Sequence, residues 1–180
     1  LRESIDRLLA YPITHLSCYL LTLPKNHFLY SRLPTEEIQL EHLLFIDSYL
    51  TQNGFEHYEI SNFARPGYRC QHNLVYWTSR SYLGFGPSAH SFDQEQSIRW
   101  RNAASLESYL RALKANSRPT LSSESLTSSQ IELEKWMLGL RLNDGFPQSW
   151  VAEPSQLKRL DRLMDHHFIE SHPDKNNYLR

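Results

Sequence analysis

The chain has 180 residues, of which 40% are hydrophobic and 22% charged, and its formal net charge is -1. This composition is typical of a globular chain that holds one ordinary domain, or part of one domain and a second small one. A nearly neutral chain has no general attraction for a phosphate backbone, so we expect no nucleic-acid partner. No apolar run reaches the roughly 20 residues that a membrane-spanning helix needs, so we expect no membrane span.

Two cysteines, Cys18 and Cys70, are too few for a disulfide scaffold, so we expect a reducing, cytoplasmic location. Cys18 lies in an apolar run and is predicted to be a small core residue, whereas Cys70 lies in a polar loop. An iron–sulfur cluster with one open iron needs three thiolates. Two cysteines cannot supply them.

The first half of the chain predicts a strand–helix–strand unit. A helix over residues 2–10 precedes an apolar run at 15–23, which is predicted to be a strand buried on both faces. Thr35 is a candidate N-cap for a long helix that ends at Asn53-Gly54, where Gly54 suits a left-handed cap. A second strand is expected at 55–63. This order is typical of a parallel sheet.

The second half begins with a short strand that runs into a Gly-rich turn within residues 81–92, followed by a helix at 105–113. The Ser- and Thr-rich segment 116–129 is predicted to be a domain linker. Helices near 130–142 and 154–166 and a final hairpin then indicate a small winged-helix-like domain. Its charge balance is slightly acidic, so a packing role fits better than DNA binding.

Three unusual segments occur in one order: Tyr58 to Ala64 (YEISNFA), His72 to Trp77 (HNLVYW) and Gly84 to Ser91 (GFGPSAHS). Together they resemble segments of the HemW / oxygen-independent coproporphyrinogen III oxidase-like radical-SAM family. The stretches 16–22, 99–102 and 134–145 extend the resemblance over nearly the whole chain. The sequence departs from the family at Leu20 and at Pro24-Lys25, where the family usually has Gln and Glu-Pro.

The resemblance implies an α/β fold. Residues 1–115 would be the C-terminal part of a partial (β/α) radical-SAM barrel, 116–129 the linker, and 130–180 a truncated HemN-type C-terminal domain that is helical and winged-helix-like. The family's cluster motif and one of its SAM segments belong to an N-terminal half. Because the sequence starts at Leu1 without a Met, we expect it to be part of a longer protein.

The resemblance also implies cofactors: S-adenosyl-L-methionine (SAM), a [4Fe-4S] cluster whose ligands lie outside this chain, and, for a HemW-type member, haem. The residues that it places near SAM are Thr22, Gly84, Phe85, Gly86, Ser88, Ala89 and His90. The glycines can also be explained by tight packing at a strand end.

The residues implied for a haem or tetrapyrrole are His72, Asn73, Tyr76 and Trp77, with His72 a possible iron ligand because histidine is a common axial ligand of haem. The alternative is that the aromatic residues belong to the core and His72 is a hydrogen-bonded loop residue. Glu59 is expected to share a strand face with Ser61, either positioning SAM or substrate or lying at a solvated rim.

Three functions follow from this. The first is a HemW-type protein that binds haem and delivers it to recipient proteins. The second is an oxygen-independent coproporphyrinogen III oxidase that decarboxylates propionate side chains in porphyrin biosynthesis. The third, from another class, is a non-catalytic interaction module formed by the winged-helix-like tail.

Overall fold

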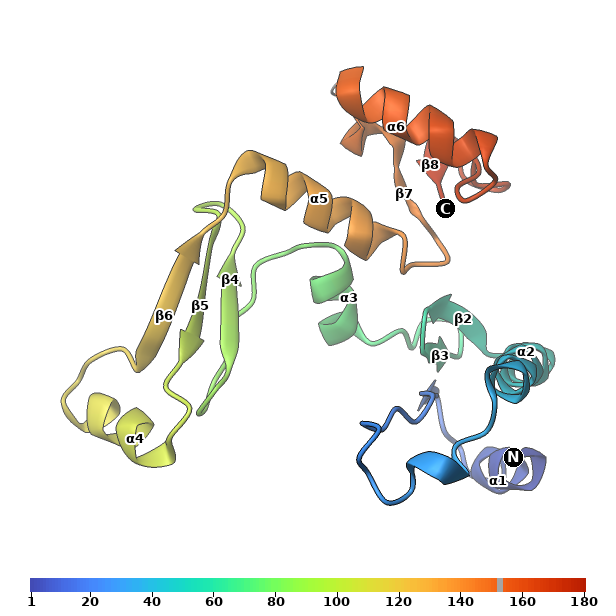
Figure 1. Cartoon of the computed structure of the whole chain (residues 1–180), viewed down its shortest axis with the longest axis horizontal. Helices are drawn as coiled ribbons and strands as arrows, with labels where there is room; N and C mark the ends of the chain where they lie inside the picture. The colour runs from blue at the N-terminus through green and yellow to red at the C-terminus, as the bar shows by residue number, and fades with distance from the viewer. Residues whose placement is uncertain (152–153) are drawn as a thin grey trace. The chain divides into compact units, whose positions relative to one another are not determined.

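A computed structural model of the chain describes residues 1–151 and 154–180 and divides them into two compact units, Leu1–Cys70 and Gln71–Arg180 (Figure 1). Within these described ranges, no helix is both long and apolar enough to cross a membrane. The helices are α1 (Arg2–Leu9), η1 (Tyr30–Arg32), α2 (Glu36–Gln52), α3 (Gln71–Trp77), α4 (Leu106–Lys114), α5 (Ser128–Gly139), η2 (Gln148–Trp150) and α6 (Pro154–Asp165). The strands are β1 (His15–Ser17), β2 (Glu56–Glu59), β3 (Asn62–Ala64), β4 (His90–Asp93), β5 (Ile98–Asn102), β6 (Thr120–Ser125), β7 (Phe146–Pro147) and β8 (Tyr178–Leu179).

The first unit packs α1 and α2 against a small sheet. Its core is formed by four buried side chains, Ile5, Leu50, Phe55 and Phe63. Cys18 is half-buried against this cluster, and its burial raises the pKa of the thiol. The predicted core role of Cys18 is confirmed.

The long helix was predicted at the right place. Thr35 occupies the N-cap position of α2, although its side chain makes no capping hydrogen bond. At the other end the backbone of Gly54 has a φ of +80°, which is the left-handed conformation predicted for that residue.

The predicted pairing of the two strands in the first unit is wrong. The chain turns at Ile60 and Ser61, so the segment 55–63 forms β2 and most of β3 as a hairpin rather than one strand. The sheet order is β1-β3-β2, with both pairs antiparallel. Because β3 has only three residues, the strand pairing ends at Ser17, the Cys18 N–H donates to the carbonyl of Ser61 in the turn, and Tyr19 and Leu21 are largely exposed.

The second unit contains a three-stranded antiparallel sheet in the order β4-β5-β6. Residues 120–125 were expected to belong to an irregular linker, but they form β6 and pair with β5 over its whole length. All six side chains of β6 are exposed, which explains why an edge strand here is polar. Helix α4 lies at one end of the sheet, and α5 begins at the other end (Figure 1).

A second core lies in the C-terminal part of this unit. Phe146, Val151, Leu160, Ile169 and Leu179 are buried together. Strand β7 pairs with β8, and the backbone groups of Glu170 and Arg180 exchange two hydrogen bonds. The predicted terminal hairpin is therefore present, and it is joined by a strand from residues 146–147 that was not predicted.

Candidate functional site

Residues 71–77 form a helix, α3, so His72 does not lie in the loop that was expected for it. Helical spacing places His72 and Tyr76 on one face, since residues four apart are neighbours. The His72 Nε2 and the Tyr76 hydroxyl lie 3.0 Å apart within hydrogen-bonding distance, and the two rings meet edge to face. His72 is exposed, and within the described part of the chain its Nδ1 has no hydrogen-bond partner.

The aromatic residues of α3 connect it to the rest of the second unit. Tyr76 packs edge-on against Tyr82, with ring centroids 4.6 Å apart. Burial is the main cause of the raised pKa of the Tyr82 phenol, with Tyr76 adding to it. Trp77 is partly buried beneath the Arg141 guanidinium, and its Nε1 is a buried donor without a partner among the described residues. The prediction that these aromatics belong to a core is thus half correct, because they are packed but remain partly accessible.

The Gly-rich turn, residues 84–90, is held in place by residues that follow it. The Asn102 side chain donates hydrogen bonds to the carbonyl oxygens of Gly84 and Gly86, at 3.2 and 3.0 Å. The Gly84 N–H donates to the Ser91 hydroxyl, and the Gly86 N–H donates to the Tyr109 hydroxyl. Asn102 and Ser91 are buried, so these contacts are shielded from water.

Gly84 is required by a close approach of the chain to itself. A Cβ on this residue would collide with the carbonyl oxygen of His90, which is backbone and cannot move aside. This supports the packing explanation for that glycine. Ser88 adopts a positive φ of 61° and donates its N–H to the carbonyl of Ala103. The backbone N–H groups of Gly84, Gly86, Ser88 and Ala89 are all used within the unit.

The exposed groups of the Gly-rich turn are side chains rather than backbone amides. Phe85 is 82% exposed and stands at the edge of a hollow of about 630 Å³. The hollow lies beside the sheet and α4, and its lining includes Leu83, Trp100, Tyr109 and Leu113. His90 is exposed at the start of β4. A flat apolar ring system is the kind of group that such aromatic lining accommodates.

The two predicted site residues of the first unit have different environments. Thr22 is exposed in a segment without regular structure, so it does not end a strand as predicted. Glu59 is fully buried, which excludes the solvated-rim explanation. Its carboxylate accepts hydrogen bonds from the Ser61 N–H, at 3.0 Å, and from the Asn62 side chain. Because the chain turns after Glu59, Ser61 is not on the same strand face.

These contacts continue through a polar network. The side-chain oxygen (Oδ1) of Asn62 accepts a hydrogen bond from the Ser17 hydroxyl. The Asn62 side-chain amide thus links the buried Glu59 carboxyl group to an exposed hydroxyl. On the neighbouring strand the Tyr58 hydroxyl lies 2.8 Å from the His15 Nε2. A buried carboxylate needs such partners. The Ser61 N–H and the Asn62 side-chain amide give the Glu59 carboxyl group its hydrogen-bond partners.

No group of three or more His, Cys, Asp or Glu side chains that could hold a metal ion occurs within residues 1–151 and 154–180. The sequence contains only two cysteines, and both belong to the first unit. The thiolates of a [4Fe-4S] cluster therefore do not fit the residues of this chain.

Comparison with known proteins gives consistent relatives, although no family model matches the sequence. The heme chaperone HemW of Lactococcus lactis is 32% identical over 153 residues, which cover 80% of this chain and 39% of that protein. HemW of Mycobacterium tuberculosis is 29% identical over 176 residues, covering 92% of this chain and 45% of that protein. Among solved structures, the radical SAM enzyme coproporphyrinogen III oxidase (HemN) from Escherichia coli superposes with a TM-score of 0.71, covering 99% of this chain and 46% of that one.

The chain is a HemW/HemN-like C-terminal half. It spans less than half the length of these three proteins. The identity to HemN is 17%, so that similarity shows the fold alone, and it confirms the expected α/β fold of the C-terminal part of a radical SAM protein. In this HemW/HemN-like chain, sequence reasoning had matched Arg99 and Asn102 to a family stretch without a role for either. The buried amide of Asn102 fixes the Gly-rich turn.

Proposed function

We propose that this chain is the C-terminal half of a HemW-type radical SAM protein that binds haem and delivers it to a recipient protein. Two observations support the proposal. The first is the similarity to proteins named heme chaperone HemW over 80–92% of the chain. The second, which carries the residue assignment, is the exposed face of α3 on which His72 and Tyr76 lie together.

His72 is the residue we assign to the haem iron, because an exposed imidazole can provide an axial ligand. The Nδ1 atom can bind the metal while Nε2 keeps its hydrogen bond to the Tyr76 hydroxyl, which orients the ring. Tyr76 and Tyr82 add flat apolar surface beside the imidazole. Asn73 and Trp77 lie on the adjacent face of the same short helix.

For SAM, we assign the Gly-rich turn with its exposed Phe85 and His90. Thr22, an exposed residue of the first unit, stays a prediction from the family resemblance. Since the turn's N–H groups at Gly84 and Gly86 are already bonded, contact would come from side chains rather than from these amides. A [4Fe-4S] cluster with SAM would supply radical chemistry, with thiolates from outside this chain. The low cysteine content favours a cytoplasmic protein.

A second candidate function is oxygen-independent coproporphyrinogen III oxidase, and the structural similarity to HemN is the observation in its favour. The two functions separate in one pair of assays on the full-length protein. A HemW-type protein binds haem and does not decarboxylate coproporphyrinogen. An oxidase releases CO₂ from that substrate when SAM and a reductant are supplied.

Haem titration of the 180-residue chain, followed by Soret absorption, tests the assignment of His72. We expect His72→Ala to weaken haem binding about tenfold or more, which corresponds to roughly 1.4 kcal/mol. His166→Ala is the matched control, because His166 is an exposed histidine in another part of the second unit. Equal affinities for the wild type and His72→Ala would mean that the α3 motif is structural.

A further inference from the structure

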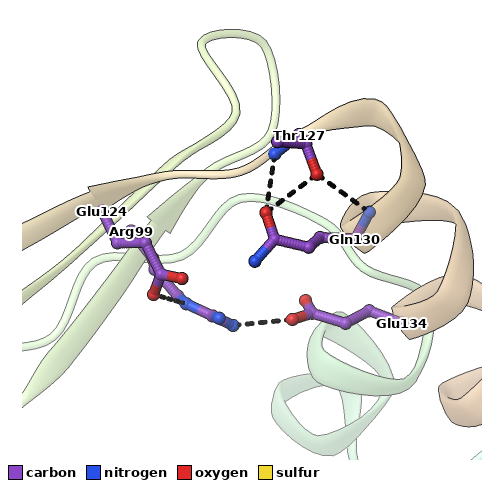
Figure 2. Close-up of polar contacts among 5 residues, drawn as sticks. All are labelled: Arg99, Glu124, Thr127, Gln130 and Glu134. Carbon is purple, nitrogen blue, oxygen red and sulfur yellow. Dashed lines mark hydrogen bonds and ion pairs between the residues drawn. The ribbon is translucent and has the colours of Figure 1, made fainter.

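Two arginines on one face of β5 have opposite environments. Arg99 and Arg101 are two residues apart, so their side chains leave the same side of the sheet. Arg99 contacts two carboxylates, Glu124 at 2.9 Å and Glu134 at 2.8 Å (Figure 2). Its hydrogen bond is the main cause of the lowered pKa of Glu124. The Arg101 side chain has neither a hydrogen bond nor an ion pair among the residues that the structure describes.

The Nε of Arg101 is buried without an acceptor in the described part of the chain. Leaving such a donor unsatisfied carries a free-energy penalty, which is larger for a charged group than for a neutral one. The carboxylates of Glu124 and Glu134 both accept hydrogen bonds from Arg99. Arg101 is therefore a partly exposed cation whose buried Nε lacks an acceptor among the described residues.

The neighbours of Arg101 across the sheet are also donors. His90 of β4 and Ser122 of β6 are the direct register partners of Arg101 on its two sides. Side chains opposite one another in antiparallel strands lie about 5 Å apart at Cβ. A hollow of about 380 Å³ includes all three residues in its lining. Neither His90 nor Ser122 has a side-chain hydrogen bond to another described residue.

We propose that Arg101, with His90 and Ser122 beside it, is a receptor for a carboxylate group of the ligand. The planar guanidinium offers parallel N–H donors that match the two oxygens of a carboxylate. Imidazole N–H and hydroxyl donors can complete the site. The inference deepens the proposed function, in which two ligands carry carboxylates: the tetrapyrrole through its propionates, and SAM through its methionine part.

Paired ligands with and without the carboxylate test this proposal. Haem is compared with haem dimethyl ester by Soret titration, and SAM is compared with decarboxylated SAM by calorimetry, on the wild-type chain and on Arg101→Gln. We expect the wild type to prefer one carboxylated ligand by about tenfold and Arg101→Gln to lose that preference, because the substitution removes the charge-assisted hydrogen bonds to the carboxylate. Arg159→Gln, which removes an exposed arginine of α6 in the same unit, should keep the preference.

The arm in which the preference disappears identifies the source of the carboxylate. Ser122→Ala is a milder second variant that should reduce the preference about threefold, so a folding defect of Arg101→Gln leaves the proposal testable. If Arg101→Gln and Ser122→Ala bind all four ligands like the wild type, Arg101 is structural and the proposal is overturned. Inorganic phosphate binding more tightly than acetate would overturn the choice of carboxylate.

A wild-type chain that binds neither haem nor SAM would reject the proposed function without deciding the inference. Acetate titration followed by NMR of the His90 ring then decides it. A saturable shift that Arg101→Gln abolishes supports the receptor. The absence of any shift in the wild type overturns it.

Discussion

Two segments of the second unit that carry the family resemblance differ in how they are held. The Gly-rich turn 84–90 is fixed by Asn102, Ser91 and Tyr109, and one of its glycines has no room for a side chain. On α3, the exposed His72 is bonded only to Tyr76, within the described residues. The residue types in the turn are therefore explained by the contacts that hold its shape. The exposed residues of α3 are not needed for such contacts, so they are better indicators of a ligand.

The largest effect is expected from Gly84→Ala. The new Cβ would meet the His90 carbonyl, and relieving this collision costs about 3 kcal/mol of unfolding free energy. Urea denaturation of the chain measures the loss. Gly86→Ala is the control: its Cβ would meet nothing within 4 Å, so only its positive φ of 98° opposes the change, at about 1 kcal/mol. Similar losses for the two variants would contradict the close-approach argument.

Asn102→Ala is expected to cost roughly 2 kcal/mol, because two carbonyl oxygens of the turn lose their donor. Hydrogen exchange of the Gly84 and Gly86 amides should also accelerate, since the turn loosens. Asn26→Ala, at an exposed position of the first unit, is a suitable comparison. A loss below about 0.5 kcal/mol would show that the turn keeps its shape without this amide.

Tyr109→Phe removes a single acceptor, that of the Gly86 N–H. We expect a smaller loss of about 1 kcal/mol, again by urea denaturation. Tyr68→Phe serves as the control because Tyr68 is an exposed tyrosine. If both variants are neutral, water replaces the hydroxyl of Tyr109.

The smallest change in stability is expected on α3. Tyr76→Phe and His72→Ala each lose one exposed contact and should change the unfolding free energy by at most about 0.5 kcal/mol. In the same samples, haem affinity should fall about tenfold or more for His72→Ala and by a smaller factor for Tyr76→Phe, which removes only the hydrogen bond that orients the imidazole. A large loss of stability in either variant would place α3 with the turn as a structural element.

The longer helices were predictable because their signals are local, whereas the seven-residue helix α3 was not predicted. Periodicity and the terminal Gly54 placed α2 correctly. The strands were harder, since FEHYEISNF has the composition of one buried strand and gives no sign of the turn at Ile60–Ser61. The Ser-rich residues 120–125 have a linker's composition, but pairing with β5 makes them an edge strand. The local pattern of residue types does not determine which backbone groups form hydrogen bonds with segments that are distant in the sequence.

The candidate site shows the same division. The sequence singled out His72, Tyr76 and the Gly-rich turn through their unusual residue types. It gave no sign that Asn102 secures the turn, or that Arg101 differs from Arg99, because both facts depend on cross-strand register and on where Glu124 and Glu134 lie. The strand signal that was present is the alternation of the two arginines with Trp100, which puts two cations on one face.

The Arg99 contacts also affect how α5 can move. The helix leaves β6 through Leu126 and is capped at Thr127, whose side chain and Gln130 satisfy each other (Figure 2). One turn further on, Glu134 forms an ion pair with Arg99 of the central strand β5. The start of α5 is therefore joined to the sheet by the chain connection through Leu126 and by this ion pair. Because Glu124 has a lowered pKa, its link to Arg99 persists at neutral pH and is lost as acid protonates the carboxyl. Added salt screens the same partly exposed charges. Salt therefore weakens both the link between β5 and β6 and the ion pair that holds α5 to the central strand.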